Sequence, residues 1–335
     1  MRLLIYLTIL SLSIPAAAQQ EFVMTVNGPI PLQEMGTTLV HEHILTDFIG
    51  ADSTGYHRWD RGEVMNIVTP YLEQAGNLGA VTIVECTPAF IGRDPLLLKM
   101  LSKQTGLHLM TNTGYYGAAD NKFLPSHAFT ETSDQLAERW AREWTMGIEG
   151  TGIKPGFIKI GVSSDSLSPL HEKLVVAAAK THLQTGLTIA SHTGKAIPAL
   201  QQIEVLRKEG VRAEAFIWVH AQGETDLQQH IIAAQKGAWI SLDGLHDSNL
   251  EQYLKMVQNL EAHHLLHKVL LSHDAGWFSP GEPNGGDFRG YSVLFEKFLP
   301  LLLHSGFSNA DIEQLLLINP QKAMSVKIRS RPKVK

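Results

Sequence analysis

The sequence predicts an α/β fold, a closed (β/α)8 TIM barrel with a short N-terminal β-hairpin. Eight short runs are apolar at nearly every residue, as in parallel strands covered on both faces, and helical patterns separate them. No Gly-rich phosphate loop follows the first run, which argues against an open doubly wound sheet. The runs are TTLVH (37–41), AVTIVE (80–85), LHLMTNT (107–113), FIKIG (157–161), LTIASH (187–192), FIWVH (216–220), WISLD (239–243) and KVLLSH (268–273).

The first 18 residues have the layout of a secretory signal peptide. Arg2 gives a positive start, residues 3–14 form an apolar stretch, and Ala16 begins a run of small residues before Gln19. A membrane anchor is the alternative, but this stretch is shorter than the about 20 apolar residues of a bilayer span. We expect residues 1–18 to be removed on export, to the periplasm of a Gram-negative source or otherwise to the outside, leaving a protein without a membrane segment.

Residues 19–335 form one domain in this prediction. EFVMTVNGPIPL (21–32) is typical of a β-hairpin, and the helical segments include HEKLVVAAAKTHLQ, IPALQQIEVLRKEG and TDLQQHIIAAQKG, of which the last two end in a glycine after a basic residue. The single cysteine, Cys86, excludes an internal disulfide and is expected to be a small buried residue. The basic tail SVKIRSRPKVK is expected to be solvated. A net charge of −5 argues against nucleic acid as a partner.

Polar residues interrupt the apolar pattern near the carboxyl ends of five runs, where barrels of this kind build their active sites. His41 and His43 are two residues apart, so both side chains point to the same face. A lone histidine at a strand end is usually only hydrogen-bonded, but several imidazoles with a carboxylate match the ligands that zinc and its neighbours prefer. The candidate metal ligands are His41, His43, Lys159, His192, His220 and Asp274.

Lys159 lies inside the fourth run, between Ile158 and Ile160. A charged ammonium is costly in a strand buried on both faces unless it is paired or neutralised. The side chain could extend to solvent or pair with an acid such as Glu85. A third solution is that the neutral amine takes up carbon dioxide and becomes a carbamate, an anionic ligand able to bridge two metals.

Several segments between Val23 and Met324 resemble the phosphotriesterase-related family of the amidohydrolase superfamily. They are TVNGPIPLQEMGTTLVHEH, the lone lysine of FIKIG, ASHTG, FIWVH, LLSHD and INPQKAM. The resemblance implies a binuclear site, with two divalent cations that we expect to be zinc. It places the more buried cation on His41, His43 and Asp274 and the more exposed one on His192 and His220, with N6-carboxylated Lys159 and a hydroxide as bridges.

The same resemblance implies catalytic roles for Asp274 and Lys159. The bridging hydroxide would attack the substrate, and Asp274 would accept its proton and deliver it to the leaving group. His273, His246 or Glu224 could carry protons outward. Alternatively, His273 supports the ligands from behind and His246 is a solvated loop residue.

The substrate pocket is expected to lie among the loops that follow the strands. The loop AGWFSPGEPNGGDFRG is long and contains Trp277 and Arg289, while Tyr115 and Tyr116 follow the third run. These four residues either bind substrate or only pack.

The expected function is hydrolysis of a lactone or another carboxylic ester of small size. Lactonases of the family carry an arginine after the aspartate of the seventh strand, but here Gly244 follows Asp243, which argues against acyl-homoserine lactones. A phosphotriester hydrolase, a catalytically silent zinc-binding protein, and an isomerase or lyase remain alternatives. A homodimer is left open.

Overall fold

The computed structural model describes residues 21–163 and 165–331, so the expected leader lies outside the described residues. Strands β1 (Phe22–Thr25) and β2 (Gly28–Pro31) pair antiparallel, which confirms the predicted hairpin. No helix in the described part of the chain is long and apolar enough to cross a membrane.

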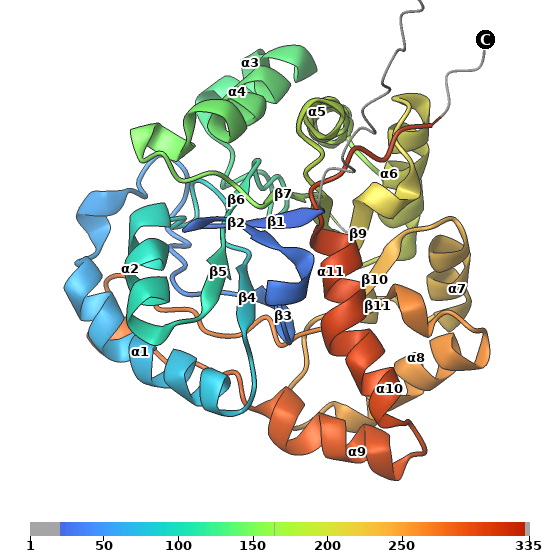
Figure 1. Ribbon diagram of the computed structural model, residues 1–335. Coiled ribbons are helices and arrows are strands. Elements are labelled where there is room, and N and C mark those ends of the chain that lie inside the picture. Colours follow the sequence, from blue (N-terminus) through green and yellow to red (C-terminus); the bar gives the residue numbers. More distant parts are fainter. Residues whose placement is uncertain (1–20, 164, 332–335) are drawn as a thin grey trace, which may run out of the picture.

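The parallel strands form the predicted barrel, with helices around it (Figure 1). The third predicted run is divided at Thr111, so that its first half pairs with the second strand and its second half with the fourth. The strands are β3 (Thr38–Glu42), β4 (Thr82–Glu85), β5 (His108–Met110), β6 (Asn112–Thr113), β7 (Phe157–Gly161), β8 (Ile189–His192), β9 (Phe216–Val219), β10 (Trp239–Leu242) and β11 (Val269–Leu271).

The barrel closes where its first strand, β3, meets the end of its last, β11. The amide of Asp274 donates to the carbonyl of His41 over 3.0 Å, and the amide of His41 donates to Oγ of Ser272 over 3.0 Å. Residues more than 200 positions apart in the chain are therefore neighbours at this seam.

At least one helix follows each barrel strand, with β5 and β6 taken as one, and covers the outside of the barrel (Figure 1). The three predicted helical segments lie in α5, α6 and α7, and Gly186, in the left-handed region at φ 77°, ends the first of them. The helices are α1 (Arg61–Asn77), α2 (Pro95–Thr105), α3 (Ser126–Thr130), α4 (Ser133–Met146), α5 (Pro169–Thr185), α6 (Ala196–Lys208), α7 (Leu227–Gln235), α8 (Leu250–Ala262), α9 (Leu299–His304), α10 (Asn309–Glu313) and α11 (Asn319–Met324), with π-helical turns at Leu294–Phe298 and Gln314–Ile318.

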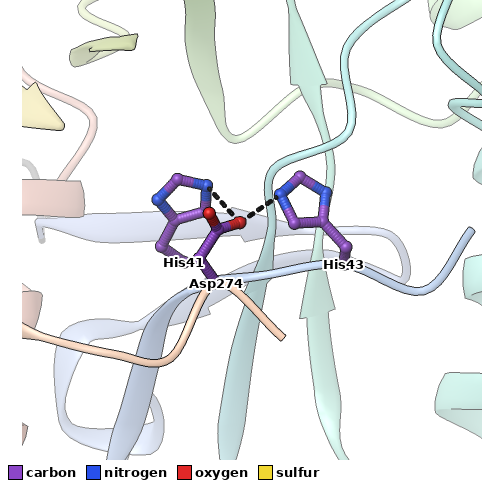
Figure 2. A group of neighbouring side chains, drawn as sticks. All are labelled: His41, His43 and Asp274. Carbon is purple, nitrogen blue, oxygen red and sulfur yellow. Dashed lines mark ion pairs between the residues drawn. The ribbon is translucent and has the colours of Figure 1, made fainter. Parts of the chain in front are cut away.

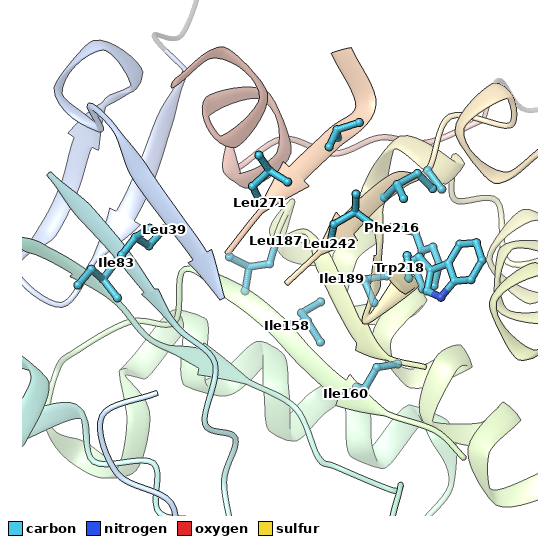
Figure 3. Close-up of a cluster of buried hydrophobic side chains, with 14 of the residues drawn as sticks. Leu39, Ile83, Ile158, Ile160, Leu187, Ile189, Phe216, Trp218, Leu242 and Leu271 are labelled. Atoms are coloured by element: carbon cyan, nitrogen blue, oxygen red, sulfur yellow. The ribbon is translucent and has the colours of Figure 1, made fainter. Parts of the chain in front are cut away.

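The apolar side chains of the strands belong to two hydrophobic layers. One layer fills the barrel and includes Val40 and Phe157, whereas the other lies between strands and helices and includes Leu39, Ile158 and Trp218 (Figure 3). Alternation along β7 therefore places Lys159 on the inner face with Phe157.

The first strand breaks this alternation. Val40 belongs to the inner layer, and yet the next residue, His41, also lines the pocket inside the barrel. The register between β3 and β4 shifts between Leu39 and Glu42, and an irregularity of this kind redirects side chains near active sites. The shift allows His41 and His43 to share the inner face.

The C-terminal segment differs from the solvated tail that we expected, at least as far as Arg331. The side chain of Arg329 is 8% exposed, and its guanidinium donates to Oγ1 of Thr188 and to the carbonyl of Ser325. The amide of Arg331 donates to the carbonyl of Gly210. These partners lie just before β8, just after α11 and just after α6, and they hold the segment against the barrel. Cys86 is buried, as predicted.

Candidate metal centre

All six predicted ligands line one pocket at the carboxyl ends of the strands. His41 and His43 come from the end of β3, Lys159 from β7, His192 from β8, His220 from the residue after β9, and Asp274 from the loop after β11. The rings of His41 and His220 lie 5.0 Å apart, and those of His192 and His220 lie 4.4 Å apart. The structure therefore brings the side chains together as the strand-end pattern predicts.

One group of potential ligands consists of His41, His43 and Asp274 (Figure 2). Oδ1 of Asp274 lies 2.9 Å from Nε2 of His43 and 3.6 Å from Nε2 of His41. Burial alone would raise the pKa of Asp274, but His41 and His43 hold it below its usual value. The group thus offers two imidazole nitrogens and an ionised carboxylate within 4.8 Å of one another.

Asp243, which the sequence analysis did not select as a site residue, fixes two of the histidines. Its buried carboxylate places Oδ2 3.0 Å from Nδ1 of His41 and Oδ1 2.7 Å from Nδ1 of His220. Burial would raise the pKa of Asp243, but His220 and His41 hold it well below the usual value. An Nδ1–H that donates to a carboxylate leaves Nε2 with its lone pair free for a metal.

Asp243 forms a second candidate group with His41 and His220, but its hydrogen bonds favour a supporting role over that of a ligand. Its oxygens also accept hydrogen bonds from Oγ of Ser241 and the amide of His220, so they are already occupied. Its position in the sequence could have identified it as a site residue, because Asp243 closes the seventh run just as His192 closes the fifth. His43 has a corresponding support in Thr87, whose Oγ1 lies 2.7 Å from Nδ1.

Lys159 is 2% exposed, and its Nζ lies 3.2 Å from Nε2 of His41. Within the described part of the chain, no carboxylate lies within 4.0 Å of this nitrogen. Glu85, the partner considered from the sequence, instead accepts hydrogen bonds from the amides of Ile44 and Thr87. Pairing with Glu85 is therefore wrong, and burial also rules out extension to solvent.

His192 and His220 form the more open half of the site. Burial first, then the neighbouring His220, lowers the pKa of His192 well below its usual value, so its ring is neutral near pH 7. His220 adopts a left-handed backbone with φ 61°, which brings its side chain to the pocket although it follows the outward-facing Trp218 by two positions. Nε2 of His220 lies 3.9 Å from Oδ2 of Asp274.

These donors fit divalent metal ions. The imidazoles of His41 and His220 are oriented through Nδ1, a carboxylate faces them, and the buried amine of Lys159 has no acidic partner among the described residues. Nitrogen and oxygen donors in such an arrangement suit zinc and related cations.

Residues 21–324 match the model of the phosphotriesterase family. The chain belongs to this family. It is 31% identical over 291 residues to the phosphotriesterase homology protein of Escherichia coli, covering 86% of this chain and 97% of the relative. It is 28% identical over 312 residues to an aryldialkylphosphatase of Saccharolobus solfataricus, covering 88% and 97%. A lactonase structure from Listeria monocytogenes superimposes with a TM-score of 0.79 at 25% identity, covering 91% and 99%.

The protein is thus a metal-dependent hydrolase of the phosphotriesterase family, and the resemblance found in its motifs is confirmed. The similarity extends over nearly the whole described chain, so it includes the entire barrel and not only a single motif. Because the chain belongs to a family of hydrolases, an enzyme is favoured over the alternative of a catalytically silent zinc-binding protein.

The two adjacent tyrosines have different roles in this phosphotriesterase-family fold. Tyr116 lines the pocket, and its ring lies 5.0 Å from that of His192. Tyr115 is buried outside the pocket, with its hydroxyl 3.0 Å from Nε2 of His127 and its ring against Trp140. Of the two roles considered for Tyr115, packing therefore applies. The expectation that it contacts substrate is corrected.

The two candidate residues in the loop after β11 also lie in different places. Trp277 lines the pocket and meets the rings of His43 at 5.7 Å and Phe48 at 5.5 Å. Arg289 is not among the residues that line it, because its guanidinium donates to the carbonyls of His273 and Asp274.

The three residues proposed as a proton relay lie outside the pocket. Nδ1 of His273 lies 2.6 Å from Oε1 of Glu42, and Nε2 accepts the amide of Leu294, so both ring nitrogens are engaged in a buried structural role. His246 is an exposed loop residue. Glu224 accepts the amide of Ala196 at the start of α6. The positions of these residues do not favour a relay, and the contacts of His273 agree with the alternative that it supports the ligands from behind.

Proposed function

We propose that this protein hydrolyses a lactone or another carboxylic ester that carries no charge and has an apolar part. The observation that carries this proposal is the wall of the pocket, which includes Phe48, Ile91, Tyr116 and Trp277. Among the described lining residues, Lys159 is the only lysine or arginine, and it lies at the buried floor. A substrate anion would find no other cationic side chain there, whereas an apolar group would be desolvated favourably.

Two divalent cations, with zinc as the expected metal, would be held at the candidate centre. His41, His43 and Asp274 would hold one, and His192 and His220 the other, with carboxylated Lys159 shared between them. When bound, such cations polarise the scissile bond and lower the pKa of water. The isolation of Lys159 from any described carboxylate supports its reaction with carbon dioxide, in which the neutral amine forms a carbamate and releases one proton.

Asp274 is the proposed proton acceptor during hydrolysis. The histidines around it keep its carboxylate ionised, so it is in the form that takes up a proton. Its place in the pocket lets it receive the proton of the attacking water and pass it to the leaving oxygen. Asp243 and Thr87 hold the imidazoles of His41, His220 and His43 in fixed orientations throughout.

Phosphotriesters are the second candidate substrates. They too are uncharged, so the same apolar wall would accept them, and the Saccharolobus relative is an aryldialkylphosphatase. Acyl-homoserine lactones are less favoured because Gly244 stands where lactonases of the family carry an arginine, and a side chain there would have to displace its neighbours. A Cβ atom at Gly244 would lie 2.7 Å from Nε2 of Gln222 and 2.9 Å from the hydroxyl of Tyr253.

A substrate panel tests this proposal. The zinc-loaded protein would be assayed with simple lactones, aryl esters and phosphotriesters of matched apolar size, in water enriched with oxygen-18. We expect the highest kcat/KM for a lactone or carboxylic ester, with one labelled oxygen in the product. Turnover of phosphotriesters alone would favour the second candidate, and product without label would indicate an isomerase or lyase.

We also propose that the protein is exported after removal of residues 1–18. The charged start, apolar stretch and small residues before Gln19 support this. N-terminal sequencing of protein from its native host should begin near Gln19, whereas an intact Met1 in cytosolic material would contradict export. The homodimer stays a proposal that analytical ultracentrifugation of the mature protein would decide.

A further inference from the structure

The backbone of Asp274 adopts an unfavourable conformation. Its φ is 53°, in the left-handed region that residues with a side chain rarely occupy. Such a residue persists when the groups around it fix the neighbouring peptides. Here the conformation presents the carboxylate to His41 and His43 (Figure 2).

Two of the four polar groups in the peptides that flank this residue are held by the first barrel strand, and so is the next carbonyl along the chain. The amide of Asp274 donates to the carbonyl of His41 over 3.0 Å. The amide of Ala275 donates to Oε2 of Glu42 over 2.9 Å, and the carbonyl of Ala275 accepts the amide of His43 over 2.8 Å. The strand that carries two candidate ligands therefore also shapes the backbone of the third.

Arg289 holds the other two groups. Its Nη2 donates to the carbonyl of Asp274 over 2.6 Å and to that of His273 over 2.6 Å. Its backbone pairs with that of Gly276 in both directions, over 2.8 and 3.1 Å. The loop lies directly on β3 at this point, since a Cβ atom on Gly276 would be 1.8 Å from the carbonyl oxygen of His43.

The charge of Arg289 is directed at the backbone. No carboxylate lies within ion-pair distance of it in the part of the chain that the structure describes. A hydrogen bond from a charged donor is stronger than one between neutral groups, so two such bonds to adjacent carbonyls constrain both peptides.

We propose that Arg289 is a positioning residue that holds Asp274 in the left-handed conformation required to face His41 and His43. This inference rests on the proposed role of Asp274 as a metal ligand. It replaces the expectation that Arg289 binds substrate. The guanidinium acts through the backbone of Asp274 and touches no reacting group.

Two substitutions and a matched control test the proposal. Arg289→Met keeps most of the apolar stem and removes all donors, while Arg289→Lys keeps the charge with a single donor group. Arg212→Met is the control, because Arg212 pairs with exposed Glu214 just before β9, at the opposite end of the strands. Metal content, the rate of zinc loss to a chelator, kcat, KM and Tm would be measured for the four proteins.

We expect Arg289→Met to lose zinc about tenfold to a hundredfold faster, as for the loss of a hydrogen bond from a charged group. Its kcat should fall with little change in KM, Arg289→Lys should be intermediate, and millimolar guanidinium should slow zinc loss from Arg289→Met. The Arg212 control should match the native protein.

Higher KM with native zinc loss would show that Arg289 contacts substrate, and native values throughout would show that it positions nothing; either result overturns the proposal. If Arg289→Met does not fold, native zinc loss from Arg289→Lys contradicts it equally. Native protein that binds no zinc would contradict the proposed function instead.

Discussion

Oδ2 of Asp243 lies 3.0 Å from Nδ1 of His41, and both side chains are buried at the floor of the pocket. The other oxygen of the same carboxylate holds His220. Because His41 and His220 belong to different proposed metal sites, this carboxylate connects the two. The orientation of both imidazoles depends on it.

Asp243→Asn should weaken the binding of both cations. An amide cannot accept hydrogen bonds from two imidazoles as a carboxylate does, and loss of such a support typically reduces metal affinity about 10- to 100-fold. Competition with a chelator would measure this affinity. Asp247→Asn is the control, since Asp247 pairs with exposed Lys297 and should bind metal normally. Normal affinity in Asp243→Asn would show that the histidines are oriented without it.

Lys159→Ala should lose both metal and turnover while the barrel still folds. The substitution removes the proposed carbamate bridge, and small carboxylic acids should partly restore both properties by occupying its place. Lys159→Arg should not be restored, because guanidinium stays charged and fills the space. Metal analysis with and without acetate would test this. If Lys159→Ala retains two cations at near-native rates, another group must form the bridge.

Tyr115→Phe and Tyr116→Leu should affect different properties. Tyr115→Phe removes the hydroxyl that meets His127 and should lower the free energy of unfolding by about 1 kcal/mol, with unchanged KM. Tyr116→Leu should raise KM about two- to tenfold through the loss of aromatic contact in the pocket, with a smaller effect on stability. Urea unfolding and ester kinetics would distinguish them. The reverse pattern would place Tyr115 in the substrate site.

His182 should make the metal-free protein less stable as pH falls. Burial lowers its pKa from 6.5 to about 4 in the folded chain, where its Nδ1 donates to the carbonyl of Leu187 and its Nε2 accepts the amide of Arg329. Between those two pKa values the unfolded chain binds a proton that the folded chain does not. The stability from His182 is thus complete above pH 6.5 and decreases towards pH 4 by about 1.4 kcal/mol per pH unit.

Comparison of the native protein with His182→Gln isolates the contribution of His182 to the pH dependence of stability. The free energy of unfolding of the native protein should fall more steeply between pH 6.5 and 4 than that of the variant. His304→Gln, at an exposed helix end, should keep the native slope. Equal slopes for the native protein and His182→Gln would mean that His182 is protonated as easily in the folded chain as in the unfolded one.

The barrel was predictable because buried parallel strands require continuous apolar runs, and a polar residue near the end of such a run is conspicuous. Lys159 stood out for this reason, and the alternation along β7 places it inside the barrel as expected. Asp243 was equally well placed in the sequence. It was overlooked because an aspartate after a strand is commonly a turn residue, and only the structure shows two histidines meeting it.

Contacts between distant segments account for the errors. Tyr115 and Tyr116 are adjacent, so sequence could not indicate which faces the pocket after the break at Thr111. For His273 the sequence left two roles open, a proton carrier or a support behind the ligands. The contact that favours the second role is with Glu42, more than 200 residues earlier in the chain. The tail containing Arg329 appeared solvated from its charge, but Thr188 and Ser325 offer it buried oxygen acceptors.

The seam between β3 and β11 has a consequence for the order of events during biosynthesis. His41 and His43 are made early, whereas Asp274 and the loop that carries Arg289 appear only after four-fifths of the chain. A nascent chain that lacks its last strand therefore has His41 and His43 but not yet Asp274. Binding of a cation by His41, His43 and Asp274 together would therefore follow synthesis of nearly the whole chain, and the bound ion would connect the first strand to the last.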